Sequence, residues 1–275
     1  MGLRVNTNIS SIAAQRELSN VSGRLARNFQ RLSSGLRIAT ASDDPAGLGI
    51  SERMRSQLRS IRQASRNGQD GISLVQTAEG ALGESNNSLA RMRELAISAA
   101  NGTLNSGDRI TLNQEFAALT SELDRLANST QFNGVNLLNV DGGVIEIQIG
   151  TESGESIALN LSDSSVSGLG LSATGFNINT VTGATAALNV IDTAIDSLTQ
   201  TRGALGASQN RLETAVRSLG NAEQNLASAE SRIRDVDVAF ETADLTRNTI
   251  LQQASVSVLS QANLQPQIAL SLLQG

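Results

Sequence analysis

The side chains best placed to do chemistry are two pairs of carboxylates, Asp43 with Asp44 and Asp235 with Asp237. Neighbouring carboxylates supply the oxygen ligands that divalent cations such as Ca²⁺ prefer in proteins. Neither pair is followed by the glycine-centred loop and the regularly spaced further acids of such a site. Asp44 stands directly before Pro45, which is typical of a helix N-cap followed by proline at the first helical position. We therefore expect helix capping and solvent exposure at both pairs, rather than a metal site.

The composition removes most other catalytic groups. The 275 residues include no His and no Cys, and all 21 positive charges are Arg. This excludes a thiol nucleophile, an imidazole base, a His-containing triad and a Cys/His zinc site. A hydrolase built on carboxylates is the remaining enzymatic alternative, and no pair of acids lies in a pocket-forming context. We expect no enzyme and no cofactor.

The Asp pairs lie between stretches whose pattern predicts long helices. From residue 188 to residue 233, apolar residues recur in alternating steps of three and four with no proline. A 3.5-residue repeat of this length predicts one helix, about 70 Å long, that packs along partners. The apolar positions are Leu188, Ile191, Ile195, Leu198, Leu205, Leu212, Val216, Leu219, Leu226 and Ile233, and the polar positions of the same register are Arg202, Gln209, Glu223 and Glu230.

The rest of the chain is also mainly helical in pattern. Heptads run from residue 14 to residue 36, a second helix begins at Pro45 and ends near residue 101, and a third spans about 106–128. Alternating apolar residues at 145–149 and 157–161 predict a β-hairpin, and a second short strand pair is expected near 176–181. The expected fold is mainly α, a long-helix bundle or coiled coil of N- and C-terminal segments with a small β-hairpin region.

The two ends of the chain differ in charge and in polarity. Residues 1–40 carry six Arg and one acid, a balance of +5, whereas residues 235–275 carry four acids and one Arg, a balance of −3. Opposite charges favour an approach of the two ends. Residues 249–275 contain no charged side chain, and an apolar end of this kind, left exposed, associates with itself or with a partner. Folding back onto its own bundle is the alternative.

Four segments resemble bacterial flagellin: RLSSGLR at 31–37, ASDDPAGL at 41–48, TQFNG at 130–134 and the closing region 225–273. The likeness covers residues 1–140 and 185–275, and the large outer domains usual in that family have no room here. The resemblance implies a core-only subunit that polymerises into the extracellular filament of the flagellum for motility. It also implies an inner coiled-coil assembly domain of residues 1–42 plus 235–275, and a helical bundle of residues 43–234 with the hairpin region at about 140–184.

The resemblance further implies partners and a route. No apolar secretory signal opens the chain, which fits export of the unfolded subunit through the flagellar type III channel and assembly at the distal tip. Expected partners are further copies of the chain, a secretion chaperone, the filament cap and the hook–filament junction proteins, with no nucleic acid and no membrane insertion. A cytoplasmic signalling coiled coil of chemoreceptor type is the alternative, because it shares long heptads and few aromatic residues.

Two sets of site residues follow from the same resemblance. An axial contact face, which an innate immune receptor reads in related flagellins, corresponds here to Arg91, Leu95 and Glu115. The expected subunit interface comprises apolar residues of both terminal helices, namely Leu18, Val21, Leu25, Leu32, Ile250, Leu251, Val258, Leu259, Leu264, Ile268 and Leu272.

Overall fold

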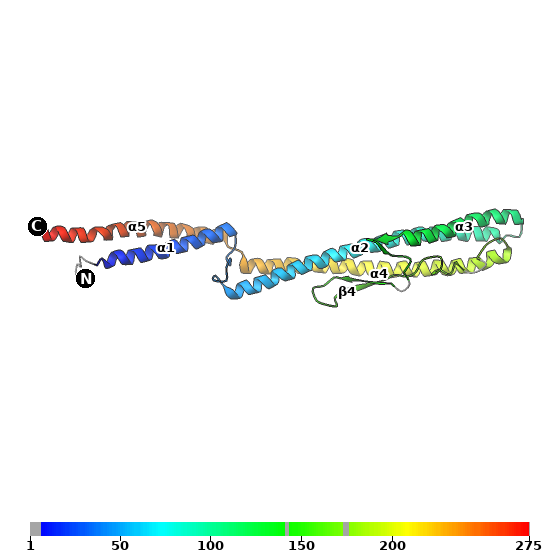
Figure 1. Cartoon of the computed structure of the whole chain (residues 1–275), viewed down its shortest axis with the longest axis horizontal. Coiled ribbons are helices and arrows are strands. Elements are labelled where there is room, and N and C mark those ends of the chain that lie inside the picture. The colour runs from blue at the N-terminus through cyan, green and yellow to red at the C-terminus, as the bar shows by residue number, and fades with distance from the viewer. Residues whose placement is uncertain (1–6, 141–142, 173–175, 275) are drawn as a thin grey trace. The chain divides into compact units, whose positions relative to one another are not determined.

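The computed structural model describes residues 7–140, 143–172 and 176–274, and side chains as far as residue 266. Its elements confirm a mainly helical fold (Figure 1). In chain order they are α1 (Ile9–Ser34), α2 (Pro45–Ala99), α3 (Ser106–Ser129), β1 (Gln131–Phe132), β2 (Val135–Asn136), β3 (Val144–Gln148), β4 (Ser156–Asn160), α4 (Val181–Arg234) and α5 (Val238–Gln274).

The chain forms two compact units. Unit 1 comprises Met1–Ser56 with Asn225–Gly275, and unit 2 comprises Gln57–Gln224. Within unit 1, α1 and α5 lie side by side (Figure 1). Unit 2 holds most of α2 and α4, all of α3 and both small sheets. The discontinuous unit 1 therefore joins the two ends of the chain, as the opposite charges of those ends lead one to expect.

One carboxylate of each predicted pair, Asp44 and Asp237, caps a helix. Asp44 Oδ1 accepts hydrogen bonds from the backbone N–H groups of Ala46, at 3.1 Å, and Gly47, at 3.0 Å, so that α2 begins at Pro45 as expected. Asp237 Oδ1 does the same at the start of α5, where it accepts from the N–H groups two and three residues later. These bonds satisfy N–H groups that the first turn of a helix leaves unpaired.

The β-hairpin prediction is confirmed. Strands β3 and β4 pair antiparallel, with Ile145 opposite Leu159 and Ile147 opposite Ile157. A second hairpin, β1 with β2, was not predicted; its turn consists of Asn133 and Gly134, both at positive φ (50° and 80°). The Asn-Gly dipeptide is the local signal for such a turn.

The strand pair expected near 176–181 is wrong. In that segment the N–H of Ile178 donates to Asn113 Oδ1 on α3 at 2.9 Å, and the Thr180 hydroxyl accepts from the N–H of Gly183 at 3.0 Å. Thr180 thereby caps α4, which begins at Val181 and not at residue 188. Buried alanines in the added turns, Ala184 and Ala187, carry the apolar face there.

One hydrophobic core holds unit 2 together. It combines residues of α2, α3, α4 and β4, including Leu82, Leu89, Phe116, Ile191 and Leu159. Two polar positions of the long-helix register, Arg202 and Glu223, lie at its margin. There Glu223 pairs with Arg62 of α2 at 2.6 Å and Arg202 pairs with Glu79 of α2 at 3.6 Å. These polar residues are ion-pair partners of the neighbouring helix.

Two glycines of α2 give a matched test of this packing. A Cβ at Gly68 would lie 2.6 Å from Val216 Cγ2 on α4, whereas a Cβ at Gly80 meets nothing within 4 Å. Val216 cannot move aside easily, because a β-branched side chain in a helix has one strongly preferred rotamer. We expect Gly68→Ala to lower the free energy of unfolding of the chain by about 1–3 kcal/mol. Gly80→Ala should raise it by about 0.5–1 kcal/mol, since Ala favours helices. Urea unfolding followed by circular dichroism measures both, and equal effects would contradict the close approach of α2 and α4.

Candidate self-assembly surface

The α1–α5 hairpin runs antiparallel. Near its open end the Asn8 amide donates to the carbonyl oxygen of Ala262 at 2.7 Å, and the Ser11 hydroxyl donates to Asn263 Oδ1 at 2.7 Å. Near its closed end Asn28 bonds to residues of the first turns of α5. These contacts fix which residues of α1 and α5 lie at the same level.

The seam between α1 and α5 is small or polar over much of its length. On α1 the buried residues are Ser11, Ala14, Val21 and Asn28. On α5 the buried residues with described side chains are Glu241, Asn248 and Ala262, and the half-buried ones are Asp244, Leu245, Thr249, Gln252, Ser255, Leu259 and Pro266. Few large apolar side chains therefore stabilise this helix pair from within.

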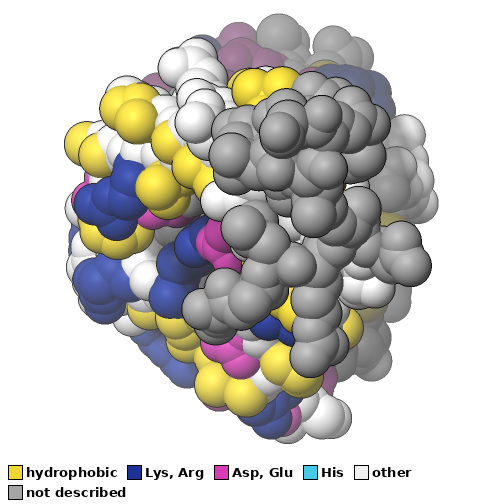
Figure 2. Space-filling view, turned by 90° about the vertical axis from the view of Figure 1, so that its left-hand side faces the viewer, with side chains coloured by type: hydrophobic (Ala, Val, Ile, Leu, Met, Phe, Trp, Pro, Cys, Tyr) yellow, Lys and Arg dark blue, Asp and Glu magenta, His cyan; other side chains and the backbone are white. Residues whose placement is uncertain are grey.

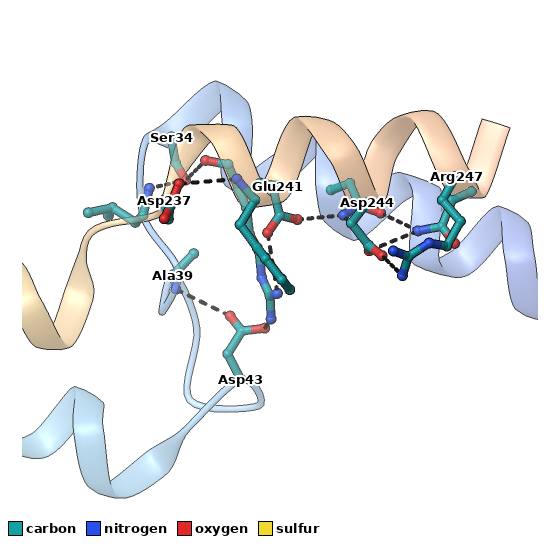
Figure 3. A network of polar contacts seen from close by, with 12 residues as sticks. Ser34, Ala39, Asp43, Asp237, Glu241, Asp244 and Arg247 are labelled. Carbon is teal, nitrogen blue, oxygen red and sulfur yellow. Dashed lines mark hydrogen bonds and ion pairs between the residues drawn. The ribbon is translucent and has the colours of Figure 1, made fainter.

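A mostly buried polar cluster occupies the seam near the closed end of the hairpin. The Asn28 amide donates to Glu241 Oε1 and, at 3.1 Å, to Asp244 Oδ2. Asn248 Nδ2 donates to Asn28 Oδ1 at 2.8 Å and to Asp244 Oδ2 at 3.0 Å. Asn28, Glu241 and Asn248 are 4%, 4% and 2% exposed. Figure 3 shows Glu241 and Asp244 on the side of α5 that faces α1.

The segment between α1 and α2 is tied to this cluster. Arg31 lies 3.9 Å from Glu241 and 3.8 Å from Asp43, so one guanidinium links α1, α5 and the linker. Asp43 Oδ2 accepts from the N–H group of Ala39 at 3.2 Å (Figure 3). It also accepts from the N–H of Thr40, at 3.0 Å, and from the Thr40 hydroxyl. The N–H of Thr40 is the main cause that lowers the pKa of the Asp43 carboxyl below its ordinary value, and the charge of Arg31 adds to it.

Backbone contacts close the hairpin. Gly35 ends α1 at φ 70°, a left-handed conformation that glycine adopts without strain. Leu36 forms an antiparallel bridge with Asp235, and the N–H of Val236 donates to the carbonyl oxygen of Gly35 at 3.0 Å. The buried Arg234 donates to Glu52 at 2.6 Å, which lowers the pKa of that carboxyl.

Large apolar side chains lie on the outside of α5. Ile250 is nine residues from both Glu241 and Leu259, so it lies about 180° around the helix from those seam residues. Ile250 and Val258 are 60% and 59% exposed. Other exposed apolar residues of α5 are Val238, Phe240, Leu251, Val256 and Leu264. We call Phe240, Ile250, Leu251, Val258 and Leu264 the outer face of α5.

The expected interface residues therefore divide into two groups. Ile250, Leu251, Val258 and Leu264 are exposed on the outer face, whereas Leu259 is half-buried in the seam. The side chains of Ile268 and Leu272 lie outside the described residues. The four residues of α1 line the seam within the chain, where Val21 is buried and Leu18, Leu25 and Leu32 are half-buried.

The end of unit 1 where the termini lie carries side chains of mixed kinds. Figure 2 shows hydrophobic side chains interspersed with Arg and acidic side chains on this face. Among the exposed apolar residues of α1 are Ile9, Ile12 and Phe29. Unit 1 thus exposes apolar side chains on α1 as well as on the outer face of α5.

The axial contact residues of unit 2 differ in accessibility. Arg91 Nε donates to Glu115 on α3 at 2.9 Å, and Arg91 Nη1 donates to Glu94 at 2.8 Å. The hydrogen bond to Glu94 is the main cause that raises the pKa of the Arg91 guanidinium, and the hydrogen bond to Glu115 adds to it. Arg91 and Glu115 are exposed, but Leu95 belongs to the core and is 4% exposed. An i, i+4 spacing places Arg91 and Leu95 on one side of α2, and packing against neighbouring elements covers only Leu95.

Two other features, a cluster for a metal ion and a membrane-spanning helix, are absent from the described part of the chain. Its acidic residues form no group that could hold a metal ion. None of the helices searched there has both the length and the apolar content needed to cross a membrane.

The buried cluster itself was not predicted as a functional feature. Asn28 stands at a position of the α1 heptad otherwise held by apolar residues, and Asn at such a position is a known determinant of helix pairing. Its partners could not be found from periodicity, because Glu241 and Asn248 are more than 200 residues away in the sequence.

Asp43 makes the linker sensitive to acid. Because the folded-state pKa of Asp43 is below the ordinary value of 3.8, its contribution to stability is complete above that pH and is lost as the pH falls through the folded-state pKa. We expect protection of the Thr40 amide to decrease as the pH falls from about 5 to below the folded-state pKa of Asp43. Hydrogen exchange normalised to intrinsic rates measures it. In Asp43→Asn the protection should be weaker and independent of pH over this range; equal protection in both chains would contradict this role of Asp43.

Comparison with known proteins identifies the family. The model of the bacterial flagellin N-terminal helical region matches residues 5–141, and that of the C-terminal helical region matches residues 188–273. A flagellin of Halalkalibacterium halodurans is 46% identical over 270 residues, which cover 98% of this chain and 99% of the relative. The flagellar filament 30.7 kDa core protein of Treponema maltophilum is 40% identical over 282 residues, 98% of this chain and 99% of the relative.

A solved structure agrees with this match. The crystal structure of Bacillus cereus flagellin has 35% sequence identity and a TM-score of 0.51, and the alignment covers 60% of this chain and 94% of that one. The relatives give no support to a chemoreceptor-type coiled coil. Matched along nearly its whole length, this chain belongs to the bacterial flagellin family as a short, core-only member, a structural protein of the flagellar filament and not an enzyme.

Proposed function

We propose that this flagellin polymerises by burying the outer face of α5, with the adjoining apolar residues of α1, against neighbouring copies. The filament is the extracellular part of the flagellum. The relatives of this chain include the flagellar filament 30.7 kDa core protein of Treponema maltophilum. The observation that carries the proposal is the placement of Ile250, Leu251, Val258 and Leu264 away from their own α1. Apolar side chains arranged around a whole helix are typical of a helix that is buried on all sides.

The seam explains why the helix pair depends on neighbours. Full burial of one Val, Leu or Ile side chain contributes about 1.5–3 kcal/mol, and the seam has few of these on α5. Isolated helices gain little stability from propensity alone, so most of it comes from tertiary packing. The hairpin is therefore only weakly stabilised in the free chain, and its packing is completed when other copies cover the outer face, which couples folding to assembly at the growing tip.

Export and the accessory partners complete the proposal. A subunit whose terminal helices fold on assembly passes through the flagellar type III channel unfolded. Before assembly, the apolar side chains of the uncharged region 249–275 are exposed. A secretion chaperone that binds α5 shields them from water. The filament cap and the hook–filament junction proteins contact the subunit during and at the start of assembly. Residues 1–42 with 235–275 form the assembly domain, and residues 43–234 form the surrounding bundle.

The Arg91 patch is proposed as an axial contact. Arg91 and Glu115 form an exposed ion pair across α2 and α3 that a neighbouring copy, or an innate immune receptor, meets directly. Leu95 supports this surface from beneath, because it is buried against the core.

Replacement of two outer-face residues tests the proposal. We expect Ile250→Ser with Val258→Ser to raise the critical concentration for seeded polymerisation by about 100-fold or more, since two apolar burials are lost. Sedimentation and negative-stain microscopy measure it. The matched control, Ile250→Val with Val258→Ile, keeps the apolar surface and should polymerise nearly as the parent does. An unchanged critical concentration in the serine variant, with normal helix content, would contradict the proposal.

A further inference from the structure

Hydrophobic burial within one chain does not by itself select the observed orientation of α5. Its seam side carries Glu241, Asn248 and Gln252 beside Leu245 and Leu259, while Ile250 and Val258 are turned to the outside. Turning α5 about its own axis would bring Ile250 and Val258 onto α1 and would also remove apolar surface from water. The surface for other copies would then be lost. Some interaction must hold α5 in the observed rotation.

The buried cluster of Asn28, Glu241, Asp244 and Asn248 provides that interaction. Four side-chain hydrogen bonds connect its members, and three of them join α1 to α5. Bonds that involve carboxylates are stronger than neutral ones. Rotation of α5 would break the bonds to Asn28, and a buried polar atom without a partner is costly.

Other contacts of the hairpin select the rotation less strictly: the Arg31–Glu241 ion pair is 3.9 Å long, and Arg31 is shared with Asp43. The backbone bridge of Leu36 with Asp235 precedes α5 and limits its position along the axis, but the helix can still turn beyond it. At the open end, Ser11 bonds to the exposed Asn263 and Asn8 bonds to a backbone carbonyl. In the middle of the seam, the Gln252 side chain makes no hydrogen bond to the described part of α1.

We propose that the Asn28 cluster determines the rotational phase of α5, so that the outer face of α5 stays available to neighbouring copies. The inference rests on the proposed function, because the outer face matters only if other copies cover it. Asn28 is then a specificity-determining residue for assembly, because it prevents the chain from burying the outer face of α5 against its own α1. Its removal should make the hairpin turn inward and assemble poorly.

Engineered disulfides can report this rotation, because the natural chain has no Cys. Ser255 and Ala254 are consecutive on α5, at nearly the same level but about 100° apart around the helix. Ser255 is half-buried on the seam, Ala254 is exposed, and the antiparallel register places both near Leu18. Leu18→Cys with Ser255→Cys reports the observed phase, and Leu18→Cys with Ala254→Cys reports the turned phase. Ser11→Cys with Asn263→Cys is the positive control for pairing.

The experiment compares the parent chain, Asn28→Leu and Gln252→Leu in each disulfide background, in both sedimented and soluble fractions. In the parent, the Ser255 disulfide should dominate. In Asn28→Leu, the ratio of the Ala254 to the Ser255 disulfide should rise at least about tenfold, as expected for loss of a buried hydrogen bond to a charged group. The sedimented fraction should fall at the same time. Gln252→Leu, an equal change of polarity on the same seam, should leave the ratio and the assembly unchanged.

Three results would overturn the proposal. An unchanged ratio in Asn28→Leu means that another contact sets the phase. Loss of both disulfides in Asn28→Leu means that the cluster is needed for pairing itself. A shift in Gln252→Leu as large as that in Asn28→Leu means that any apolar substitution in the seam turns the helix. If the parent shows the expected ratio but does not sediment with seeds, the proposed function fails while the assignment of the phase stands.

Discussion

The structure of unit 1 depends on one constraint: α5 must place the buried Glu241 and Asn248 and the half-buried Asp244 against Asn28, while most of its large apolar side chains remain exposed. Buried charged groups need hydrogen-bond partners, and Asn28 with Asn248 and Arg31 supplies them. Once these groups are satisfied on the seam, the outer face cannot also lie there. The outer face of α5 is thus exposed because the polar side chains of α5 form their hydrogen bonds in the seam.

The two units use the same kinds of residues in opposite ways. In unit 2, apolar residues of α2, α3, α4 and the β3–β4 hairpin meet in one core, and the ion pairs lie at its margin. In unit 1, the polar groups lie in the seam and many apolar ones lie outside. A core of the first kind stabilises the unit by itself, whereas the second arrangement leaves apolar residues exposed that, in our proposal, further chains cover. This difference matches a subunit that keeps a stable body and completes its ends on assembly.

The charge difference between the two ends of the chain produces few ion pairs between α1 and α5 among the described residues. Across the described α1–α5 seam, Arg31 is the Arg that approaches an acid of α5, Glu241, at 3.9 Å. Arg24 pairs instead with Glu17 on its own helix, and both are exposed. Exposed ion pairs contribute little to stability, so the total charge of +5 against −3 is a poor measure of the attraction between the helices. Hydrogen bonds within the buried cluster carry more of it.

The sequence by itself determined that the chain is mainly helical, the start of α2 at Pro45, the β3–β4 hairpin and the family, because caps, periodicity and motifs are local in the chain. Only the tertiary structure decided that Leu95 is buried, that α4 begins at Val181 and which side of α5 faces α1. The last choice could not be predicted, since α5 has apolar residues all round and its pattern selects no side. A partner 213 residues away, Asn28, makes the selection, and such a contact exists only after the chain has folded.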